Sequence, residues 1–383
     1  MTRMTRHRNG DIRSRILVYG TGPLGSLFAA RLQEGGNDVS ILARGQRLAD
    51  LREHGIVRIR IRVLHDVRTN QRSVTRVNVV EALAPDDAYD LVLVIMRKNH
   101  ALQILPVLAA NQHTPNVLFL TNNAAGPGEL VEALGRERVL IGFPNSAGYR
   151  EGHVVHCLTG TPDDADEDIR ADVFIRVDRR ITPRTRRVAH ILESAPGFGA
   201  EIRTDMDAWL KYHVALLMPS LAAALYAAGT DNYRFAHTRD LVVLSVRAIR
   251  EGFRVLQTLG YPVTPSKYRI FQWIPEPILV LVLQRWLANE MMKVALTKHA
   301  NAARDEMKHL ADEFLALART TAVPTPAIDR LYPHFDPDVP LVPEGSAEIP
   351  LRWGGLLALT AALVGIVALI RWFSRTEPRQ VQE

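Results

Sequence analysis

Three glycines with G-x-G-x-x-G spacing follow a short apolar run near the start of the chain. The pattern consists of Gly20, Thr21, Gly22, Pro23, Leu24 and Gly25. In such a turn the first glycine permits a tight bend, the second lets a phosphate approach the backbone, and the third lets the following helix pack closely on the strand. The free N–H groups at the start of that helix attract the anion. Because an apolar strand precedes this turn and a helical stretch follows it, we predict a dinucleotide site, with a purely structural turn as the alternative.

The residue at the end of the second predicted strand discriminates between nicotinamide cofactors. An NAD site usually has Asp or Glu there, which binds the ribose 2′-hydroxyl. This chain has Arg44 at that position, and Arg47 follows closely. Since a guanidinium suits the additional phosphate of NADP(H), we predict NADP as the cofactor. A solvated loop arginine is the alternative interpretation of Arg44.

The composition is that of a folded chain large enough for two domains, with 383 residues of which 47% are hydrophobic. A single cysteine, Cys157, excludes an intrachain disulfide framework, and no cysteine or histidine pattern indicates a metal site. The net charge of +6 comes from arginine clusters without a nucleic-acid-binding motif. We therefore expect no metal and no nucleic-acid partner. Solvated surface is our interpretation of the clusters, and contact with anionic lipid is the alternative.

An uncharged apolar segment, residues 353–370, lies near the C-terminus between Trp353 and Trp372. On a helix these tryptophans would be about 28 Å apart, close to the thickness of the hydrocarbon layer of a bilayer. Tryptophans at both rims are typical of an interfacial belt. We therefore predict a single membrane-spanning helix that anchors the chain, with a buried or interfacial helix as the alternative.

Cations near this segment leave its orientation open. Arg371, Arg375 and Arg379 follow the segment, whereas Arg352 alone directly precedes it. By the positive-inside rule the tail would lie in the cytosol. An NADP enzyme whose N-terminus has no apolar signal is itself expected in the cytosol. We expect cytosolic catalytic domains at the cytoplasmic face of a membrane.

Predicted strands and helices alternate through the first half of the chain, and long helical runs follow. The strands are 16–19, 39–43, 91–96, 117–120 and 139–141; the helices include 101–110, 129–134, one from 204 past 225, 238–259, 278–298 and 301–319. This order predicts an α/β fold with a Rossmann-type, doubly wound parallel sheet, followed by a mostly helical domain. We divide the chain into a basic arm (1–13), a dinucleotide-binding domain (14–203), a helical substrate domain (204–345), and a linker with the apolar anchor helix (346–383).

In the order of its motifs the chain resembles the ketopantoate reductase family over about residues 14–333. After the glycine turn and Arg44, the strand at 90–97 ends in Arg97, where the family has lysine. Residues 121–126 stand where the family has a Gln-Asn-Gly turn, and Trp209-Leu210-Lys211 opens the second domain. Asp305-Glu306 precedes a Val-Pro-Thr-Pro stop at 323–326.

The resemblance implies a Rossmann domain and a helical domain with the active site in the cleft between them. It implies NADPH-dependent reduction of a branched 2-oxo acid to the 2-hydroxy acid. The family's catalytic lysine falls on Lys211, and its substrate-binding acid falls on Glu306. Asn123 falls on a turn asparagine near the nicotinamide, and Arg97 replaces a lysine beside the cofactor.

The residues around Lys211 agree with this role. Hydride addition to a ketone builds negative charge on oxygen, which a proton donor must neutralise. A lysine can donate when burial lowers its pKa from about 10.4, and the helix face of Lys211 continues with small or apolar residues. We predict Lys211 as the general acid and Glu306 as the group that orients the substrate. A lysine extended along a domain seam and a surface glutamate are the respective alternatives.

The chain departs from the family at the polar positions that bind substrate. Ala215 and Pro219 stand where the family has asparagines, and Val294 falls near its serine. Ketopantoate itself is therefore doubtful as the substrate. Other polar residues could rebuild the pocket, namely His213, Tyr212, Ser220, His299 and Asn301.

Two functions from different classes follow from these observations. The first is an NADP-dependent reductase of a 2-oxo acid or related carbonyl, held at a membrane by its tail and able to form a homodimer. The second is a membrane-tethered sensor or scaffold that binds NADP(H) without turnover. The first requires that Lys211 reach the nicotinamide side of the interdomain cleft.

Overall fold

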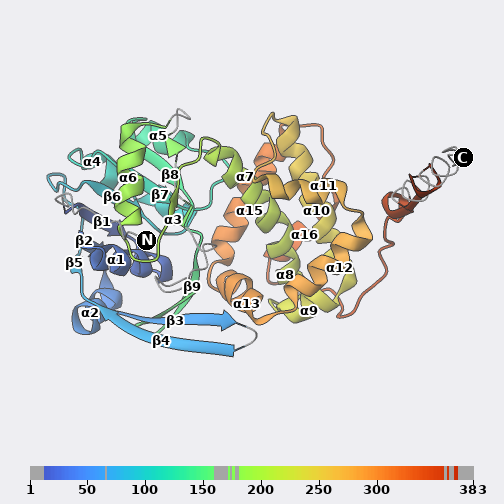
Figure 1. The fold of residues 1–383 in the computed structure, drawn as a ribbon, viewed down its shortest axis with the longest axis horizontal. Coiled ribbons are helices and arrows are strands. Elements are labelled where there is room, and N and C mark those ends of the chain that lie inside the picture. The colour runs from blue at the N-terminus through green and yellow to red at the C-terminus, as the bar shows by residue number, and fades with distance from the viewer. Residues whose placement is uncertain are drawn as a thin grey trace, which may run out of the picture.

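A computed structural model describes residues 13–64, 67–158, 171–172, 175–176, 181–357, 360–361 and 366–369. Figure 1 shows an α/β domain and a helical domain side by side, with the C-terminal segment leaving the helical domain at its far end. The predicted basic arm lies almost wholly outside the described residues.

A parallel sheet forms the centre of the first domain, in the strand order β12-β8-β7-β6-β1-β2-β5. Only β12, at one edge, runs antiparallel to its neighbour in this sheet. The central strands are continuous apolar runs that are buried on both faces, as expected for a parallel sheet covered on both sides. The strands are β1 (Arg15–Tyr19), β2 (Asp38–Leu42), β5 (Asn78–Val80), β6 (Leu91–Val94), β7 (Val117–Leu120), β8 (Val139–Gly142) and β12 (Ile175–Arg176).

Helices cover both faces of this sheet, which confirms the predicted doubly wound fold. On one face α1 (Pro23–Glu34) and α6 (Pro183–Glu193) pack their apolar sides onto β1 and β2. On the other face lie α3 (Lys98–Gln103), α4 (Leu105–Ala110) and α5 (Gly128–Leu134). The single helix predicted at 101–110 is two helices, and Pro106 in the first turn of α4 has no N–H to continue α3. Helix α2 (Gly45–His54) follows β2.

A second sheet lies beside the glycine turn, in the strand order β4-β3-β10-β9. Its strands are β3 (Ile56–Leu64), β4 (Val67–Thr75), β9 (Ala147–Glu151) and β10 (Val154–Leu158). Strand β9 passes directly over the start of α1, since a Cβ on Gly148 would contact the Pro23 side chain at 3.4 Å. Two short strands, β11 (Ala171–Asp172) and β13 (Ala200–Glu201), pair separately.

The second domain is helical and is built around the buried helix α10 (Arg239–Thr258). Its other helices are α7 (Met206–Leu216), α8 (Ala223–Ala227), α9 (Asn232–His237), α11 (Ile270–Trp273), α12 (Glu276–Leu287), α13 (Glu290–Met292), α14 (His299–Ala302), α15 (Arg304–Arg319) and α16 (Pro326–Leu331). Short 3-10 turns, η2 (Ser266–Arg269) and η4 (Tyr332–Phe335), complete it.

Two of its helices widen into π-helical turns at the cleft. Between α7 and α8 the chain forms η1 (Leu217–Ala222), and Pro219 within it lacks the N–H that a regular turn would use. The helix predicted at 278–298 ends at Leu287, and the chain continues through α13 into η3 (Lys293–Lys298). Such π turns are often found at functional sites.

The start of the predicted linker, after η4, is bound to the helical domain by hydrogen bonds. The buried Asp240 accepts the backbone N–H groups of Glu348 and Ile349 at 2.9 and 2.8 Å. These hydrogen bonds hold the pKa of Asp240 below its ordinary value, against the opposing effect of burial. The chain therefore leaves the domain at a fixed point next to Arg352.

The predicted anchor helix, 353–370, is described only in part. Its described pieces, 354–357, 360–361 and 366–369, are helical, and their apolar side chains are exposed, with Leu357 at 65%. Within the described part of the chain, a helix long and apolar enough to cross a bilayer occurs once, at 206–227, and 83% of its most apolar window is buried. Because of that burial we interpret 206–227 as a core helix of the second domain.

Candidate active site in the interdomain cleft

The glycine turn has the form that a bound pyrophosphate requires. Gly20 has φ +132°, and a Cβ there would overlap the carbonyl of Ile95, while a Cβ on Gly25 would overlap the carbonyl of Gly20. Gly22 has nothing within 4 Å on its Cβ side, so its backbone is open to a ligand. It is also the N-cap of α1, where no side chain occupies the first N–H groups. These residues fit the phosphates of a dinucleotide.

A cavity of about 1040 Å³ opens from this turn into the space between the domains. Its walls in the first domain come from the residues directly after β1, β6, β7 and β8, where parallel strands present their carboxyl ends. The second domain closes it with residues of α7, η1, η3, α14 and α15. The cavity has room for a dinucleotide and a small substrate.

Glu306, in the first turn of α15, is a buried carboxyl group at this cavity. It is 5% exposed, and its Oε1 accepts the backbone N–H of Lys98 at 3.1 Å. Burial raises its pKa to about 7, although the Lys98 N–H and the nearby Arg97 act in the opposite direction. A carboxyl group with this pKa exchanges a proton near neutral pH. The sequence predicted Glu306 as a site residue that orients the substrate, and its raised pKa is a consequence of burial.

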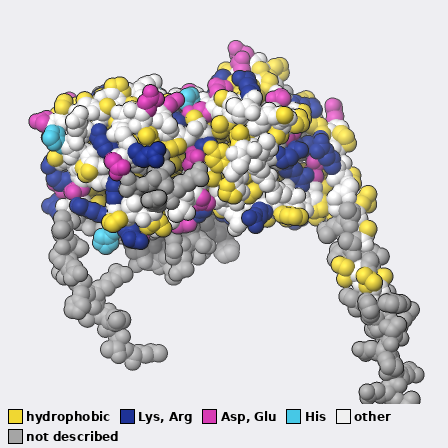
Figure 2. Space-filling model, turned by 90° about the horizontal axis from the view of Figure 1, so that it is seen from above, with side chains coloured by type: hydrophobic (Ala, Val, Ile, Leu, Met, Phe, Trp, Pro, Cys, Tyr) yellow, Lys and Arg dark blue, Asp and Glu magenta, His cyan; other side chains and the backbone are white. Residues whose placement is uncertain are grey.

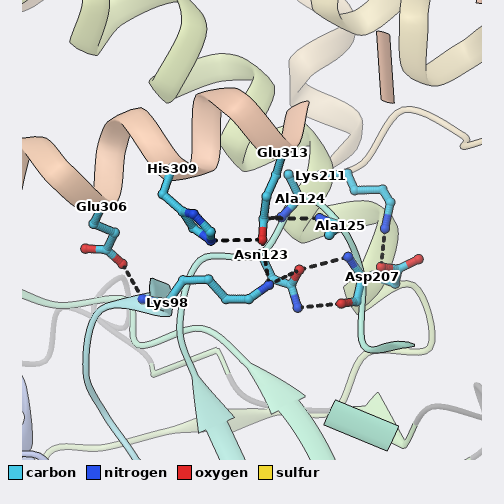
Figure 3. Close-up of polar contacts among 10 residues, drawn as sticks. Lys98, Asn123, Ala124, Ala125, Asp207, Lys211, Glu306, His309 and Glu313 are labelled. Carbon is cyan, nitrogen blue, oxygen red and sulfur yellow. Dashed lines mark hydrogen bonds and ion pairs between the residues drawn. The ribbon is translucent and has the colours of Figure 1, made fainter. Parts of the chain in front are cut away.

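A buried ion pair that the sequence did not predict lies next to Glu306. Lys98, 2% exposed, donates through Nζ to Glu313 Oε1 at 2.9 Å and to Asn123 Oδ1 at 3.0 Å. Glu313 also accepts the N–H groups of Ala124 and Ala125, at 3.1 and 3.3 Å. This cluster joins α15 to the loop after β7, as Figure 3 shows. It fixes the two domains against each other at the edge of the cleft.

Lys211 does not lie where the general-acid role requires it. It is 1% exposed, its ammonium pairs with Asp207 one turn earlier on α7, and it lies 5.0 Å from the Tyr261 ring centroid. It does not line the cavity. Figure 3 shows Lys211 and Glu306 on opposite sides of Lys98 and Asn123. The condition that we set for the reductase hypothesis, an ammonium of Lys211 in the cleft, is therefore not met.

The reason is the rotation of α7. Residues two apart on a helix point in nearly opposite directions, about 200° apart, and His213 is the residue of α7 that faces the cavity. Its ring stacks on Trp209, with centroids 5.0 Å apart, and packs on Phe143 at 4.4 Å. His213 was among the residues that we expected to rebuild the pocket, and Asn301 also lines it. Tyr212 and Ser220 are buried elsewhere and do not line it.

Of the two asparagines in the loop after β7, Asn122 faces the cavity, and Asn123 has a structural role. Asn123 closes its own loop, because its Nδ2 donates to the Gly126 carbonyl and its Oδ1 accepts the Gly126 N–H, at 2.9 and 2.8 Å. Asn122 lines the cavity, and its buried Oδ1 has no hydrogen-bond partner. A carbonyl oxygen left in this way fits the amide of a nicotinamide or a substrate hydroxyl.

Arg97 lines the cavity but is held by the second domain. Its Nη1 pairs with Asp305 at 2.8 Å, and its Nη2 donates to the Ala302 carbonyl. Asn99 donates to the same carboxylate at 3.0 Å, and these contacts keep the pKa of Asp305 below its ordinary value, while burial alone would raise it. Arg97 therefore contributes to domain closure at the place where the sequence predicted a cofactor contact.

Arginines lie at and after the carboxyl end of β2. Arg44 is exposed at the N-cap of α2 and donates through Nε to the Glu81 carbonyl at 3.3 Å. Arg47 is buried and donates to Ser26 Oγ at 3.0 Å. Burial lowers the pKa of Arg47 to about 10, with a further contribution from Arg150, which itself lines the cavity. In the described part of the chain no cluster of His, Cys, Asp or Glu is arranged to hold a metal ion.

Comparisons with known proteins agree with this architecture. Residues 16–164 match the family model described as ketopantoate reductase PanE/ApbA, whereas no curated protein sequence matches the chain. Among solved structures, 2-dehydropantoate 2-reductase from Geobacter metallireducens GS-15 is 18% identical, with a TM-score of 0.65 over 84% of this chain and 98% of that one.

Two further structures share the fold. A D-mandelate dehydrogenase bound to NADH and anilino(oxo)acetate is 14% identical, with a TM-score of 0.64 over 84% and 96% of the two chains. The dimeric ketopantoate reductase from Staphylococcus aureus is 13% identical, with a TM-score of 0.56 over 84% and 97%. At such identities the structures establish the fold, and the match over residues 16–164 carries the family. Residues 16–164 thus match the ketopantoate reductase family, and the chain as a whole shares the fold of solved ketopantoate reductases.

Proposed function

We propose that this chain catalyses the NADPH-dependent reduction of a 2-oxo acid or related carbonyl to the hydroxy compound, while its tail holds it at the cytoplasmic face of a membrane. The observation that carries the reductase proposal is that the open glycine turn and the buried Glu306 share one cavity. A bound nicotinamide would supply the hydride. The residues of the chain must then bind the carbonyl compound, exclude water and supply one proton.

Glu306 is our proposed proton donor, in place of Lys211. With a pKa raised to about 7 by burial, a large share of Glu306 carries a proton at neutral pH. The proton passes to the carbonyl oxygen as the C–H bond forms, and solvent restores it after product release. The N–H of Lys98 holds the carboxyl group in place, and Arg97 holds the neighbouring Asp305. His213, on α7, is a further polar side chain in the lining of the same cavity.

The walls of the cavity suit a 2-oxo acid with an apolar side chain. Leu217, Met218, Leu296 and Met307 form an apolar patch in the second domain. Lys298 also lines the cavity, with its ammonium 5.0 Å from the Tyr149 ring centroid, and a cation there would pair with the substrate carboxylate. The positions of the lost asparagines do not contribute: Ala215 and Pro219 are in the core.

NADPH is favoured over NADH by the charges near the carboxyl end of β2. Arg44 is exposed at the end of β2, and Arg150 lines the cavity near Arg47. Neither Arg44 nor Arg150 forms an ion pair with a described carboxylate, so both are available to a 2′-phosphate. No carboxylate follows β2 directly to bind the ribose of NAD.

The membrane-spanning tail and a homodimer belong to this proposal. The described apolar side chains of the tail are exposed, which is costly for a segment in water. The Staphylococcus aureus structure is of a dimeric reductase, and we propose that this chain can also form a homodimer.

The experiment is a substrate panel with the full chain in detergent, following NADPH absorbance. We expect turnover of 2-oxo acids with apolar side chains, and loss of that turnover in Glu306→Gln. NADPH binding without consumption of any carbonyl compound would contradict the reductase proposal. It would favour the alternative of a membrane-tethered NADP(H) sensor, which the sequestered Lys211 also suits.

A further inference from the structure

Exposed apolar side chains gather at the end of the helical domain that is farthest from the dinucleotide-binding domain. They belong to α11 and α12, which lie at the side where the tail departs (Figure 1). Trp273, the last residue of α11, is 80% exposed. The others are Ile270, Leu281, Val282 and Trp286. Large side chains of this kind in one region mark an interaction surface.

This surface adjoins the base of the tail. Trp273 lines a depression of about 510 Å³, together with Pro275, Arg352 and Gly355 from the point where the chain leaves the domain. A Cβ on Gly355 would lie 3.7 Å from Pro275. Trp353, also exposed, lies between these two tail residues in the sequence. A partner that binds the tail would therefore also contact Trp273.

The same depression carries an excess of positive charge. Arg247 and Glu276 form a bidentate pair at 2.8 and 3.0 Å, and the Glu276 carboxylate also accepts the Arg352 N–H. Arg250 is used by backbone carbonyls. Arg254 and Arg352 are exposed and form no ion pair with a described carboxylate. Burial lowers the pKa of Arg250, and the three nearby guanidinium groups of Arg247, Arg254 and Arg352 lower it further.

We propose that this surface docks onto an anionic lipid bilayer beside the tail. The docking face consists of Ile270, Trp273, Leu281, Val282, Trp286, Arg254 and Arg352. Tryptophan and arginine together suit the headgroup region, where the ring lies at the boundary and the guanidinium meets lipid phosphate. Figure 2 shows Lys and Arg side chains beside hydrophobic ones near the base of the tail.

The bilayer is favoured as the occupant because the apolar segment 353–370 starts at this face. The inference rests on the proposed membrane anchoring of the tail. It adds that the globular body lies against the membrane and does not hang freely from a flexible linker. Glu348 and Ile349 are hydrogen-bonded to Asp240, so no long flexible linker separates the helical domain from the tail, and an anchored tail brings the domain close to the membrane.

Single-cysteine probes in the full chain test the proposal, because the native Cys157 is buried and would not react. An NBD label at Gln272→Cys, next to an intact Trp273, reports on the docking face. A label at Leu369→Cys reports on the tail, and one at the exposed Asp86→Cys in the other domain is the matched control. Each protein is reconstituted into phosphatidylcholine vesicles with and without phosphatidylglycerol, and nitroxide lipids serve as quenchers.

We expect nitroxide lipids to quench the Gln272 label at least about twofold in phosphatidylglycerol vesicles, and the Asp86 label to stay in water. Trp273→Ala, or Arg254→Glu with Arg352→Glu, should remove this quenching while the Leu369 label stays in lipid. An unquenched Gln272 label beside a lipid-embedded Leu369 label would overturn the docking face alone. An aqueous Leu369 label would overturn the anchor, and the docking inference with it. A Gln272 signal that appears without lipid and rises with protein concentration would assign the face to a second copy of the chain.

Discussion

Two glutamates on α15, seven residues apart, face the same neighbouring domain with very different partners. Glu313 accepts a hydrogen bond from the Lys98 ammonium and from the N–H groups of Ala124 and Ala125. Glu306 accepts one backbone N–H from Lys98, and it faces the cavity. Burial therefore raises the pKa of Glu306 to about 7.

The difference teaches that the number of donors decides what a buried carboxyl group can do. A carboxylate whose charge is met by a cation and two N–H groups stabilises a structure. A carboxyl group with a single donor is poorly stabilised as an anion and can keep its proton. Helix α15 thus carries both Glu313, which stabilises the contact between the domains, and Glu306, the proposed acid.

Removing Glu313, the glutamate with more hydrogen-bond donors, should have the largest effect on the free energy of unfolding. Glu313→Ala leaves the Lys98 ammonium buried with only an amide oxygen, and we expect the free energy of unfolding to fall by roughly 3–5 kcal/mol. Urea unfolding measures this loss. Lys308→Met, in an exposed pair on the same helix, is the matched control and should cost at most about 1 kcal/mol. Equal losses of unfolding free energy in the two variants would show that the Lys98–Glu313 pair does not stabilise the domain interface.

Removing the proposed acid should affect turnover. Glu306→Gln keeps the shape of the side chain but cannot supply the proton, so we expect kcat to fall on the order of 100-fold or more. For the wild type, kcat for carbonyl reduction should decline as the pH rises through about 7, because the protonated form is then lost. A variant with unchanged kcat and an unchanged pH profile would refute the role of Glu306.

The stability of the protein should also respond to the protonation of Glu306. Its folded-state pKa lies above the ordinary value of 4.5, so its contribution is fully present below that value and is lost as the pH rises towards about 7. The wild type should lose up to roughly 3 kcal/mol over this range through this group. Denaturant midpoints at several pH values, compared with those of Glu306→Gln, isolate the contribution. Parallel curves for the two proteins would mean that the carboxyl group is ionised throughout.

The cofactor proposal predicts a smaller effect, on the KM for NADPH, when Arg44 at the end of β2 is removed. Arg44→Ala should raise the KM for NADPH by about tenfold, and leave that for NADH nearly unchanged, because one charge-assisted contact to the 2′-phosphate is lost. Arg52→Ala, which removes an exposed arginine paired with Glu81, is the control. If Arg44→Ala raises the KM for NADPH and the KM for NADH equally, Arg44 does not bind the 2′-phosphate.

The smallest effect on turnover is expected at the other buried lysine. Lys211→Met removes an ammonium that pairs with Asp207 away from the cavity, so kcat should fall by less than the roughly 100-fold that loss of a general acid brings. Steady-state kinetics beside Glu306→Gln decide the order. A larger loss of kcat in Lys211→Met than in Glu306→Gln would identify Lys211, and not Glu306, as the general acid.

Much of the first domain could be predicted because its signals are local. The apolar runs at 16–19, 117–120 and 139–141 are strands within one residue of their expected bounds. The glycine turn can be recognised from the sequence because the spacing of its glycines, between an apolar strand and a helix, is itself the signal. Glu306, predicted from the family resemblance, and His213 and Asn301, named as polar residues that could rebuild the pocket, all line the cavity.

Which residues line the cavity depended on the direction of side chains, which the sequence does not give. Apolar residues cover both faces of α7, so its pattern does not say whether Lys211 or His213 faces the cleft. In the loop after β7, the difference between Asn122 and Asn123 is one residue, and hydrogen bonds within the loop decide it. Lys98 showed no signal at all, because its partner Glu313 is far away in the sequence.

The sequence by itself determined the α/β fold, the glycine turn and the order of the two domains, since these follow from apolar periodicity and from the conformations that glycine permits. Only the tertiary structure decided which buried charges are satisfied and which carboxyl group keeps a raised pKa. Those properties depend on how many donors from the other domain reach each group, and that number exists only once the two domains are packed together.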